Sequence, residues 1–235
     1  NEFRGSELFW AHTVKELYVP AVQYFAEALF ERLLPPFDNL SQEAEKLADQ
    51  EFQRLGALPA FCESNGGDIA ERAQDNAVVW YSSMAAVRQS VINLCAVGLR
   101  HLFEQQLFDF IRHVPLARRG RADYEKDLKA LCENGVDCQS FRSWPTLEEL
   151  RLVCNAVKHA EGSATAQLKS MRSDLFIDPN MKGLPLFDRP GSVIQPLAGE
   201  DMYLRESDIE KYAAAIQSFW DEVSKRLEQM AAEAT

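Results

Sequence analysis

The sequence predicts an all-α protein: a helical bundle with an N-terminal helical arm and one irregular segment rich in proline and glycine. Three observations predict this class. Apolar residues recur every three or four positions through most of the 235 residues, which is the period of one helix face. Two Thr/Ser-x-x-Glu pairs mark helix starts. Proline and glycine gather in one stretch, residues 174–206, and interrupt this periodicity.

The first 66 residues are predicted to form a helical arm packed on the main domain, which we place at residues 67–235. Residues 6–34 have the apolar spacing of a helix, and Pro20 either kinks this helix or begins a second one. Ser41 is a suitable N-cap for a further helix that ends at the next glycine.

The longest periodic stretch runs from Ile69 to Ile111 without a proline and predicts the central helix of the core. It is either one long helix or two helices joined near Gly98, and Asp68 is the expected cap. The positions predicted to be buried include Val79, Val87, Leu94, Leu99, Phe103 and Leu107.

Two capping pairs predict where later helices begin. Thr146 and Glu149 would cap a helix that starts near Leu147. Ser207 and Glu210 would cap the final amphipathic helix. Shorter helices are expected at residues 124–132 and 162–171, and an extended connection, with room for a short hairpin, at residues 174–206.

The composition excludes several function classes. Lys and Arg number 25 against 36 Asp and Glu, a net charge of -11, so any contact with RNA must be local and broad attraction to nucleic acid or to an anionic membrane is not expected. The apolar run Ser90–Leu99 is too short to span a bilayer. The five cysteines, without a Cys-x-x-Cys pair, indicate free thiols and a cytoplasmic location.

Arg151, Asn155 and His159 stand four residues apart in the helix predicted after Thr146. Residues four apart differ by about 40° in azimuth, so the three side chains share a stripe of about 80° over two turns. An imidazole can exchange a proton with an RNA 2′-hydroxyl, a guanidinium can hold a phosphate and a carboxamide can orient either. Lys158 would add positive charge from the flank. This motif stripe has the groups that a metal-free ribonuclease needs.

These residues can also be interpreted as ordinary surface side chains without a catalytic or binding role. Arg151 and Lys158 would then be solvated cations on a helix surface, and His159 would lie near a helix C-terminus, where a cation is favourable. Spacing alone favours this interpretation.

The stretch "ELRLVCNAVKHAEGSA", which follows a long helix ending "LFEQQLFDFIRH", resembles the HEPN superfamily of small all-α domains. The closing "YLRESDIEKYAAAIQSFWDEV" extends the resemblance, whereas the opening arm is not covered. Ribonucleases of this superfamily carry Arg, a polar residue and His on one late helix, usually as Arg-Asn-x-x-x-His. Asn155 and His159 match this pattern. Cys154, however, stands where Arg is usual, and the nearest upstream arginine is Arg151.

The resemblance implies a metal-independent endoribonuclease, of the toxin or phage-defence type, that leaves a 2′,3′-cyclic phosphate. His159 would be the general acid and base, Arg151 and Asn155 its catalytic partners, and Lys158 a phosphate contact; no cofactor is implied. Two protomers would pair their motif helices as a homodimer, with an antitoxin or other regulatory protein as a further partner. The alternative, favoured by Cys154, is a catalytically silent HEPN-like module that binds RNA, a nucleotide or a partner protein. A third alternative is a helical adaptor without a ligand site.

Two other clusters carry weaker signals. Arg118, Arg119 and Arg121 form the densest positive patch, which can contact RNA phosphates or be a solvated loop. Glu104 is expected to pair with Arg100 and is a candidate for orienting the histidine. The four histidines are scattered and no metal-binding or nucleotide-binding motif is present, so no metal site is predicted.

Overall fold

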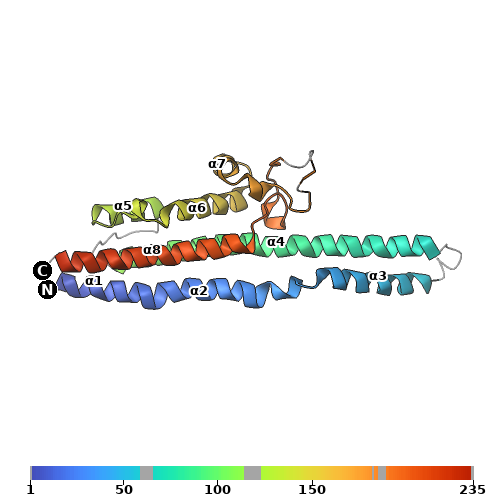
Figure 1. Ribbon diagram of the computed structural model, residues 1–235, viewed down its shortest axis with the longest axis horizontal. Coiled ribbons are helices and arrows are strands. Elements are labelled where there is room, and N and C mark those ends of the chain that lie inside the picture. Colours follow the sequence, from blue (N-terminus) through green and yellow to red (C-terminus); the bar gives the residue numbers. More distant parts are fainter. Residues whose placement is uncertain (1, 59–65, 114–122, 182, 185–188, 234–235) are drawn as a thin grey trace.

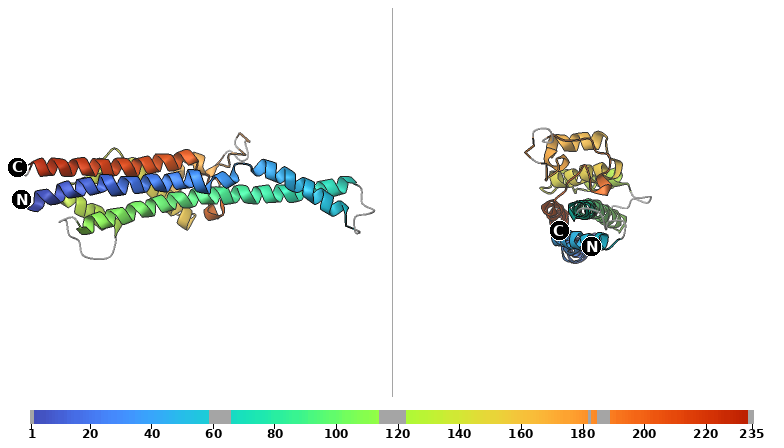
Figure 2. Two further views of the ribbon diagram at one scale, coloured as in Figure 1. Left: turned by 90° about the horizontal axis from the view of Figure 1, so that it is seen from below. Right: turned by 90° about the vertical axis from the view of Figure 1, so that its right-hand side faces the viewer.

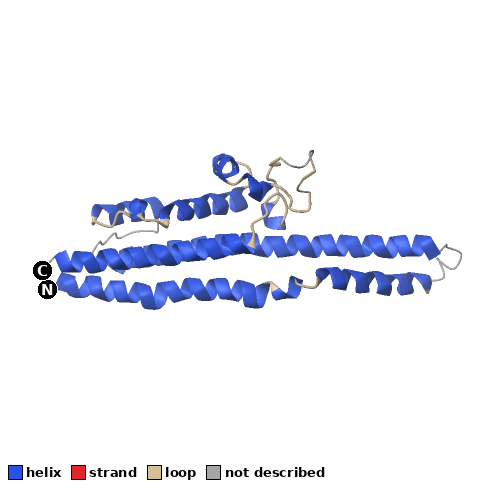
Figure 3. Ribbon diagram, in the orientation of Figure 1, coloured by secondary structure: helices blue, strands red, loops and turns tan. Residues whose placement is uncertain are grey.

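The structure is a computed structural model that describes residues 2–58, 66–113, 123–181, 183–184 and 189–233. Throughout these residues it contains helices and no strand, so the predicted all-α class is confirmed (Figure 3). The α-helices are α1 (Glu2–Thr13), α2 (Val19–Ala28), α3 (Leu40–Gly56), α4 (Gly66–His113), α5 (Tyr124–Glu133), α6 (Trp144–His159), α7 (Ser163–Met171) and α8 (Glu206–Glu233). None of the helices in these ranges is both long and apolar enough to cross a membrane.

Helix α4 is the axis of the molecule and spans most of its length (Figure 1). Its 48 residues form one continuous helix. Of the two predicted arrangements, one long helix or two helices joined near Gly98, the first is observed. Gly98 admits a ring from α2, because a Cβ at this position would lie 2.6 Å from Cζ of Phe25. Asp68 lies inside the first turn and not at the cap position, where its negative charge still favours the helix N-terminus.

The N-terminal segment forms a nearly continuous rod alongside α8. A π-helical turn, Val14–Tyr18, joins α1 to α2, and Pro20 lies in the first turn of α2. Proline is tolerated there because the N–H groups of a first turn have no intrahelical partner. The second of the two predicted roles of Pro20, the start of a new helix, is therefore the observed one.

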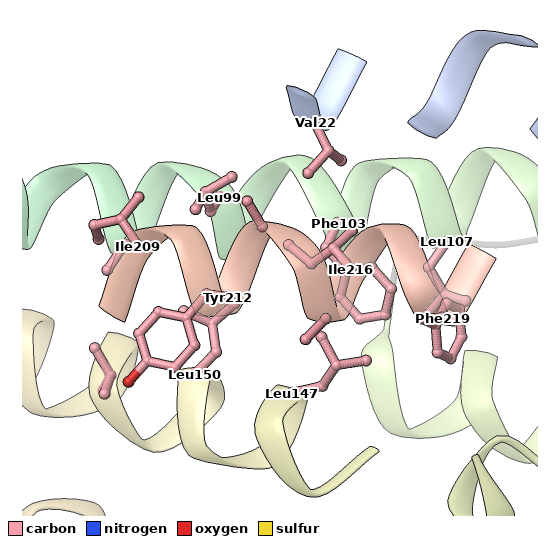
Figure 4. Packing of buried hydrophobic residues seen from close by; sticks show 14 of the residues in the cluster. Val22, Leu99, Phe103, Leu107, Leu147, Leu150, Ile209, Tyr212, Ile216 and Phe219 are labelled. Atoms are coloured by element: carbon pink, nitrogen blue, oxygen red, sulfur yellow. The ribbon is translucent and has the colours of Figure 1, made fainter. Parts of the chain in front are cut away.

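The core lies where α4 and α8 run side by side. Helices α1 and α2 cover one side of this pair and α6 covers the other (Figures 1 and 2). Leu147 and Leu150 of α6 point toward α8 and α4 in Figure 4. Helix α8 was predicted to be amphipathic, and its apolar stripe is buried at every position, namely Ile209, Tyr212, Ala213, Ile216, Phe219, Trp220, Val223 and Leu227. The N-terminal segment contributes Val14, Val22 and Leu29 to the same core.

Three of the predicted buried positions of α4 are wrong. Leu99, Phe103 and Leu107 are buried, as predicted, whereas Val79, Val87 and Leu94 are exposed. Val79 lies in the N-terminal part of α4, which packs against α3 (Figure 1). Val87 lies next to the start of α8, where Arg88 pairs with Glu206, and Leu94 lies about two turns further along α4. Two packed helices cover only part of each other's surface, so an apolar position there need not be buried.

The capping pair predicted for α6 is wrong, because its carboxylate has other partners. Helix α6 begins at Trp144, before Thr146, and Glu149 faces α8. Glu222 of α8 caps the helix instead: its carboxylate accepts hydrogen bonds from the backbone N–H groups of Arg142 at 2.9 Å and Ser143 at 3.4 Å. The cap of α6 is thus a tertiary contact.

The capping pair predicted for α8 is also wrong, by two residues. The helix begins at Glu206, and the backbone N–H of Arg205 donates to the Asp208 carboxylate at 2.9 Å. This is the carboxylate half of a capping box, placed earlier than the Ser207–Glu210 pair.

Residues 174–206 form an irregular segment that packs against α4, and the irregular structure was predicted. The segment contains 3-10 turns at Ser173–Phe176 and Pro196–Ala198, and the residues described there form no hairpin. Asn93 of α4 anchors the segment by donating to the carbonyl oxygens of Pro196 at 2.8 Å and Met202 at 3.0 Å. Gly199 has a φ of +80°, and a Cβ there would lie 1.9 Å from the carbonyl oxygen of Ala86. Both facts require glycine.

Candidate functional site

A buried carboxylate clamps α6 onto α8 and onto the segment after α7. The Glu149 carboxylate accepts three hydrogen bonds. The donors are Tyr212 Oη at 2.8 Å, Lys211 Nζ at 2.7 Å and Arg172 Nη1 at 2.5 Å. Burial alone would raise the pKa of Glu149, but these donors and the charges of Lys211 and Arg172 hold it below the usual carboxyl value. The clamp fixes the rotation of α6 and so decides where each motif side chain points.

Arg151 lies in a pocket of about 480 Å³ between α5 and α6, together with Tyr124 and Trp144. Glu148 holds its guanidinium: Nε and Nη2 each lie 2.9 Å from the same carboxylate oxygen. Asn155 and His159 are not part of this α5–α6 pocket. The structure therefore separates Arg151 from the other two residues of the motif stripe.

Asn155 and His159 line a second pocket, of about 330 Å³, where α6 meets α7. The other lining residues of this α6–α7 pocket are Ala160, Gly162, Ser163, Ala164 and Thr165. The His159 side chain is exposed, so a ligand can reach the imidazole from solvent.

Ala160 makes the turn between the two helices in a conformation that L-residues rarely adopt, with φ 57° and ψ -128°. The Thr165 hydroxyl donates to the carbonyl oxygen of Ala160 and holds this turn. Such a conformation costs about 1–3 kcal/mol and persists only where the surrounding structure fixes it. The turn brings the N-terminus of α7 next to His159.

The N-terminus of α7 gives the α6–α7 pocket a positive potential. Gly162 occupies the cap position and has no side chain to accept from the first-turn N–H groups. Free N–H groups and a helix dipole of about half a positive charge attract anions at such a site. Across the pocket, the last turn of α6 contributes His159. The arrangement suits a phosphate group.

Lys158 lies on the other flank of α6, beside the thiol of Cys154. Burial raises the pKa of Cys154, and the neighbouring Lys158 ammonium opposes this shift. Cys154 is only 3 % exposed. Lys158 is not one of the residues that line the α6–α7 pocket, so it acts on that pocket from the flank.

The predicted pair on α4 is confirmed: Arg100 Nε donates to Glu104 at 2.9 Å. The Arg100 side chain is 2 % exposed, and its guanidinium carbon lies 3.9 Å from the centre of the Tyr124 ring. Glu104 is held by Arg100 and is not part of the α6–α7 pocket. The structure thus does not bring Glu104 to His159.

The remaining predicted residues lie outside the described residues: Arg118, Arg119 and Arg121. In the part of the chain that the structure describes, no group of three His, Cys, Asp or Glu side chains is placed to hold a metal ion. The cysteines described there are free thiols, namely Cys95, Cys132, Cys138 and Cys154.

Ala160 and the start of α7 belong to the site although the sequence pattern did not predict them there. The available signal was the Gly-Ser pair at residues 162–163 directly after the histidine, because both residue types are favoured at helix N-termini. The backbone strain at Ala160 had no sequence signal.

Comparison of the chain with protein-family models, with curated proteins and with solved structures found no match. The resemblance to HEPN ribonucleases therefore rests on the motif helix and the closing helix of the sequence, and a function follows only from the chemistry of the site.

Proposed function

We propose that this chain is a metal-independent endoribonuclease of the HEPN type, used as a toxin or in phage defence, with His159 as general acid and base. One observation carries the proposal: Asn155, His159 and the uncapped N-terminus of α7 line a single solvent-accessible pocket. A proton-transfer group and an anion-binding group thus lie at one place.

The chemistry needs no metal. A scissile phosphate would bind the first-turn N–H groups of α7, with Asn155 as a further hydrogen-bonding partner. His159 would take the proton of the 2′-hydroxyl as this oxygen bonds to phosphorus. The bond from phosphorus to the 5′-oxygen breaks, and that oxygen receives a proton from the imidazolium. The products are a 2′,3′-cyclic phosphate and a free 5′-hydroxyl.

Arg151 takes a different role in this proposal from the one implied by the resemblance. Glu148 neutralises its guanidinium, and it lies in the α5–α6 pocket beside the aromatic side chains of Tyr124 and Trp144. Aromatic rings that line a groove can stack on the bases of single-stranded RNA. Arg151 would therefore contact a neighbouring nucleotide and not the scissile phosphate.

The test is incubation of the wild-type protein and of a His159→Ala variant with total RNA and with tRNA in EDTA. His101→Ala is the matched control, because His101 is also exposed and helical but bonds to Gln105 on α4. We expect cyclic-phosphate ends from the wild-type and control proteins and at least 100-fold less cleavage from His159→Ala. Equal cleavage by all three folded proteins would refute the role of His159.

A second candidate function is a catalytically silent HEPN-like module that binds RNA through the same two pockets. The Arg151–Glu148 ion pair and the buried Cys154 favour it, because neither leaves a guanidinium beside His159. This candidate predicts that the folded wild-type protein binds single-stranded RNA without cutting it, and that His159→Ala weakens the binding.

A further inference from the structure

A long part of α4 is almost without charge. From Asn76 to Leu99 the sequence carries one charged residue, Arg88, in a protein whose net charge is -11. Arg88 forms an ion pair with Glu206 at the start of α8. A surface helix normally keeps charged residues on its solvent side, so this segment has an unusual surface.

Apolar side chains form a stripe along this segment. Val79 is 66 % exposed, Val87 is 42 % exposed and Leu94 is 51 % exposed. Their separations of eight and seven residues keep them within about 80° of one another around the helix. We call this surface the α4 stripe; it also includes Ser83 and Ser90, which lie between the three apolar residues.

The two serines do not prevent the stripe from being buried. The Ser83 hydroxyl donates to the carbonyl oxygen of Val79 at 2.8 Å, and the Ser90 hydroxyl donates to that of Ala86 at 2.9 Å. Both hydroxyl donors are thus satisfied within α4. Burial is costly mainly when a polar group loses its hydrogen bond, so the stripe can leave water at little cost.

We propose that the α4 stripe is a homodimer interface, on which a second copy of this chain packs its own α4 stripe in the antiparallel direction. A two-fold axis would pass near Val87. Val79 of one protomer would then lie opposite Leu94 of its partner, because these residues are nearly equidistant from Val87 in the sequence. An isologous contact of this kind is the commonest form of protein oligomer.

Charge favours a second copy over other occupants. Two acidic copies repel each other wherever their charged surfaces meet, and the α4 stripe offers a surface without that repulsion. RNA or an anionic membrane would require Lys or Arg, and a basic partner would require Asp or Glu; the five residues of the stripe include none of these. An uncharged apolar stripe is complementary to itself.

The stripe would form the apolar centre of the dimer contact. A segment of this length extends about 36 Å at about 1.5 Å per residue, and one helix is about 10 Å wide, so the area is on the order of 360 Å² per protomer. A standard stable interface buries about 800 Å² per partner, of which the apolar centre is one part and a polar rim is the rest.

The resemblance implied pairing through the motif helix instead. After its first turn, the exposed residues of α6 are Lys158 and His159, and both are polar. Exposed apolar side chains also lie on α1 and α2, such as Phe9 and Tyr24, but charged residues lie among them. The α4 stripe is both apolar and without charge, which is why we place the dimer contact there. This inference does not depend on the proposed ribonuclease activity.

The oligomeric state tests the inference. Sedimentation velocity of the full chain should show a monomer–dimer equilibrium, and Val79→Glu should raise the dissociation constant of the dimer by about 100-fold or more. Val78→Glu is the matched control, since Val78 is also exposed on α4 but lies about 100° around the helix from Val79. The control should stay within about threefold of the wild type.

Two results would overturn the inference. One is a wild-type protein that is monomeric at every concentration up to several hundred micromolar. The other is an equal loss of dimer in Val79→Glu and Val78→Glu when circular dichroism shows that both are folded. The register has its own test, in a background with Cys62 and Cys132 replaced by serine. Cys132 is the exposed cysteine among those that the structure describes, and Cys62 lies outside the described residues. In this background Val87→Cys should cross-link to its partner, and failure to do so would exclude an axis near Val87.

Discussion

The Glu149 clamp makes a sharp prediction for stability. Glu149→Ala removes the acceptor of three hydrogen bonds at once, from Tyr212, Lys211 and Arg172. The three donors differ in the hydrogen-bond partners that they keep in the variant. Lys211 is partly exposed and its ammonium group can bind water instead, so the loss of this hydrogen bond costs little.

The other two donors set the magnitude. The Tyr212 hydroxyl is buried and would be left without an acceptor, which costs about 1–3 kcal/mol. Arg172 keeps its ion pairs with Asp174 and Asp208, so we assign about 1 kcal/mol to its lost bond. The free energy of unfolding should therefore fall by about 3 kcal/mol, which lowers Tm by about 6–12 °C for a chain of this size.

Thermal and urea unfolding, followed by circular dichroism, check this prediction. Glu148→Ala is the control, because Glu148 directly precedes Glu149 but is partly exposed and forms an ion pair with Arg151 on the surface of α6. The control should lose no more than about 1 kcal/mol. Equal losses in the two variants would refute the assignment of the clamp to Glu149.

Three further predictions concern stability. Because the pKa of folded Glu149 is lowered, its contribution is present above the unfolded pKa of about 4.3 and is lost as the pH falls below it; the stability gap between wild type and Glu149→Gln, measured by urea unfolding, should therefore be constant from pH 6 to 8 and shrink toward pH 3. Gly199→Ala should lower the free energy of unfolding by about 2 kcal/mol or more through the clash with the Ala86 carbonyl, whereas Gly191→Ala, with no described atom near its Cβ, should change it by less than about 0.5 kcal/mol. Ala160→Gly should raise Tm by about 2–4 °C, since glycine relieves about 1 kcal/mol of backbone strain at this φ.

The helices could be predicted from the sequence because apolar periodicity is a local property. The stripe of α8 and the Arg100–Glu104 pair are set by spacing alone and were predicted correctly. The helix caps were not, because a carboxylate binds the strongest donors that the tertiary structure brings to it. Glu149 accepts a hydrogen bond from Tyr212 of α8 and does not bind the N–H groups at the α6 N-terminus.

The exposed positions of α4 mark a second limit of sequence analysis. Periodicity identifies an apolar face, but it does not say which element covers that face. At Phe103 the cover is the same chain, through Phe219 of α8. At Val79 and Leu94 the described residues leave 66 % and 51 % of the surface exposed, and a second copy of the chain would cover this remainder.

The division of the motif stripe follows from the rotation of α6. Glu149 faces α8, and Cys154, about 140° further around the helix, packs near Arg100 of α4. An arginine at position 154, as in the usual pattern, would bury its guanidinium beside that of Arg100. Two buried positive charges at one place are strongly unfavourable without a further carboxylate. The same rotation turns Asn155 and His159 toward α7. In the proposed function, the absence of an arginine at position 154 and phosphate binding at the α7 terminus would thus both follow from one orientation of α6, which the Glu149 clamp holds in place.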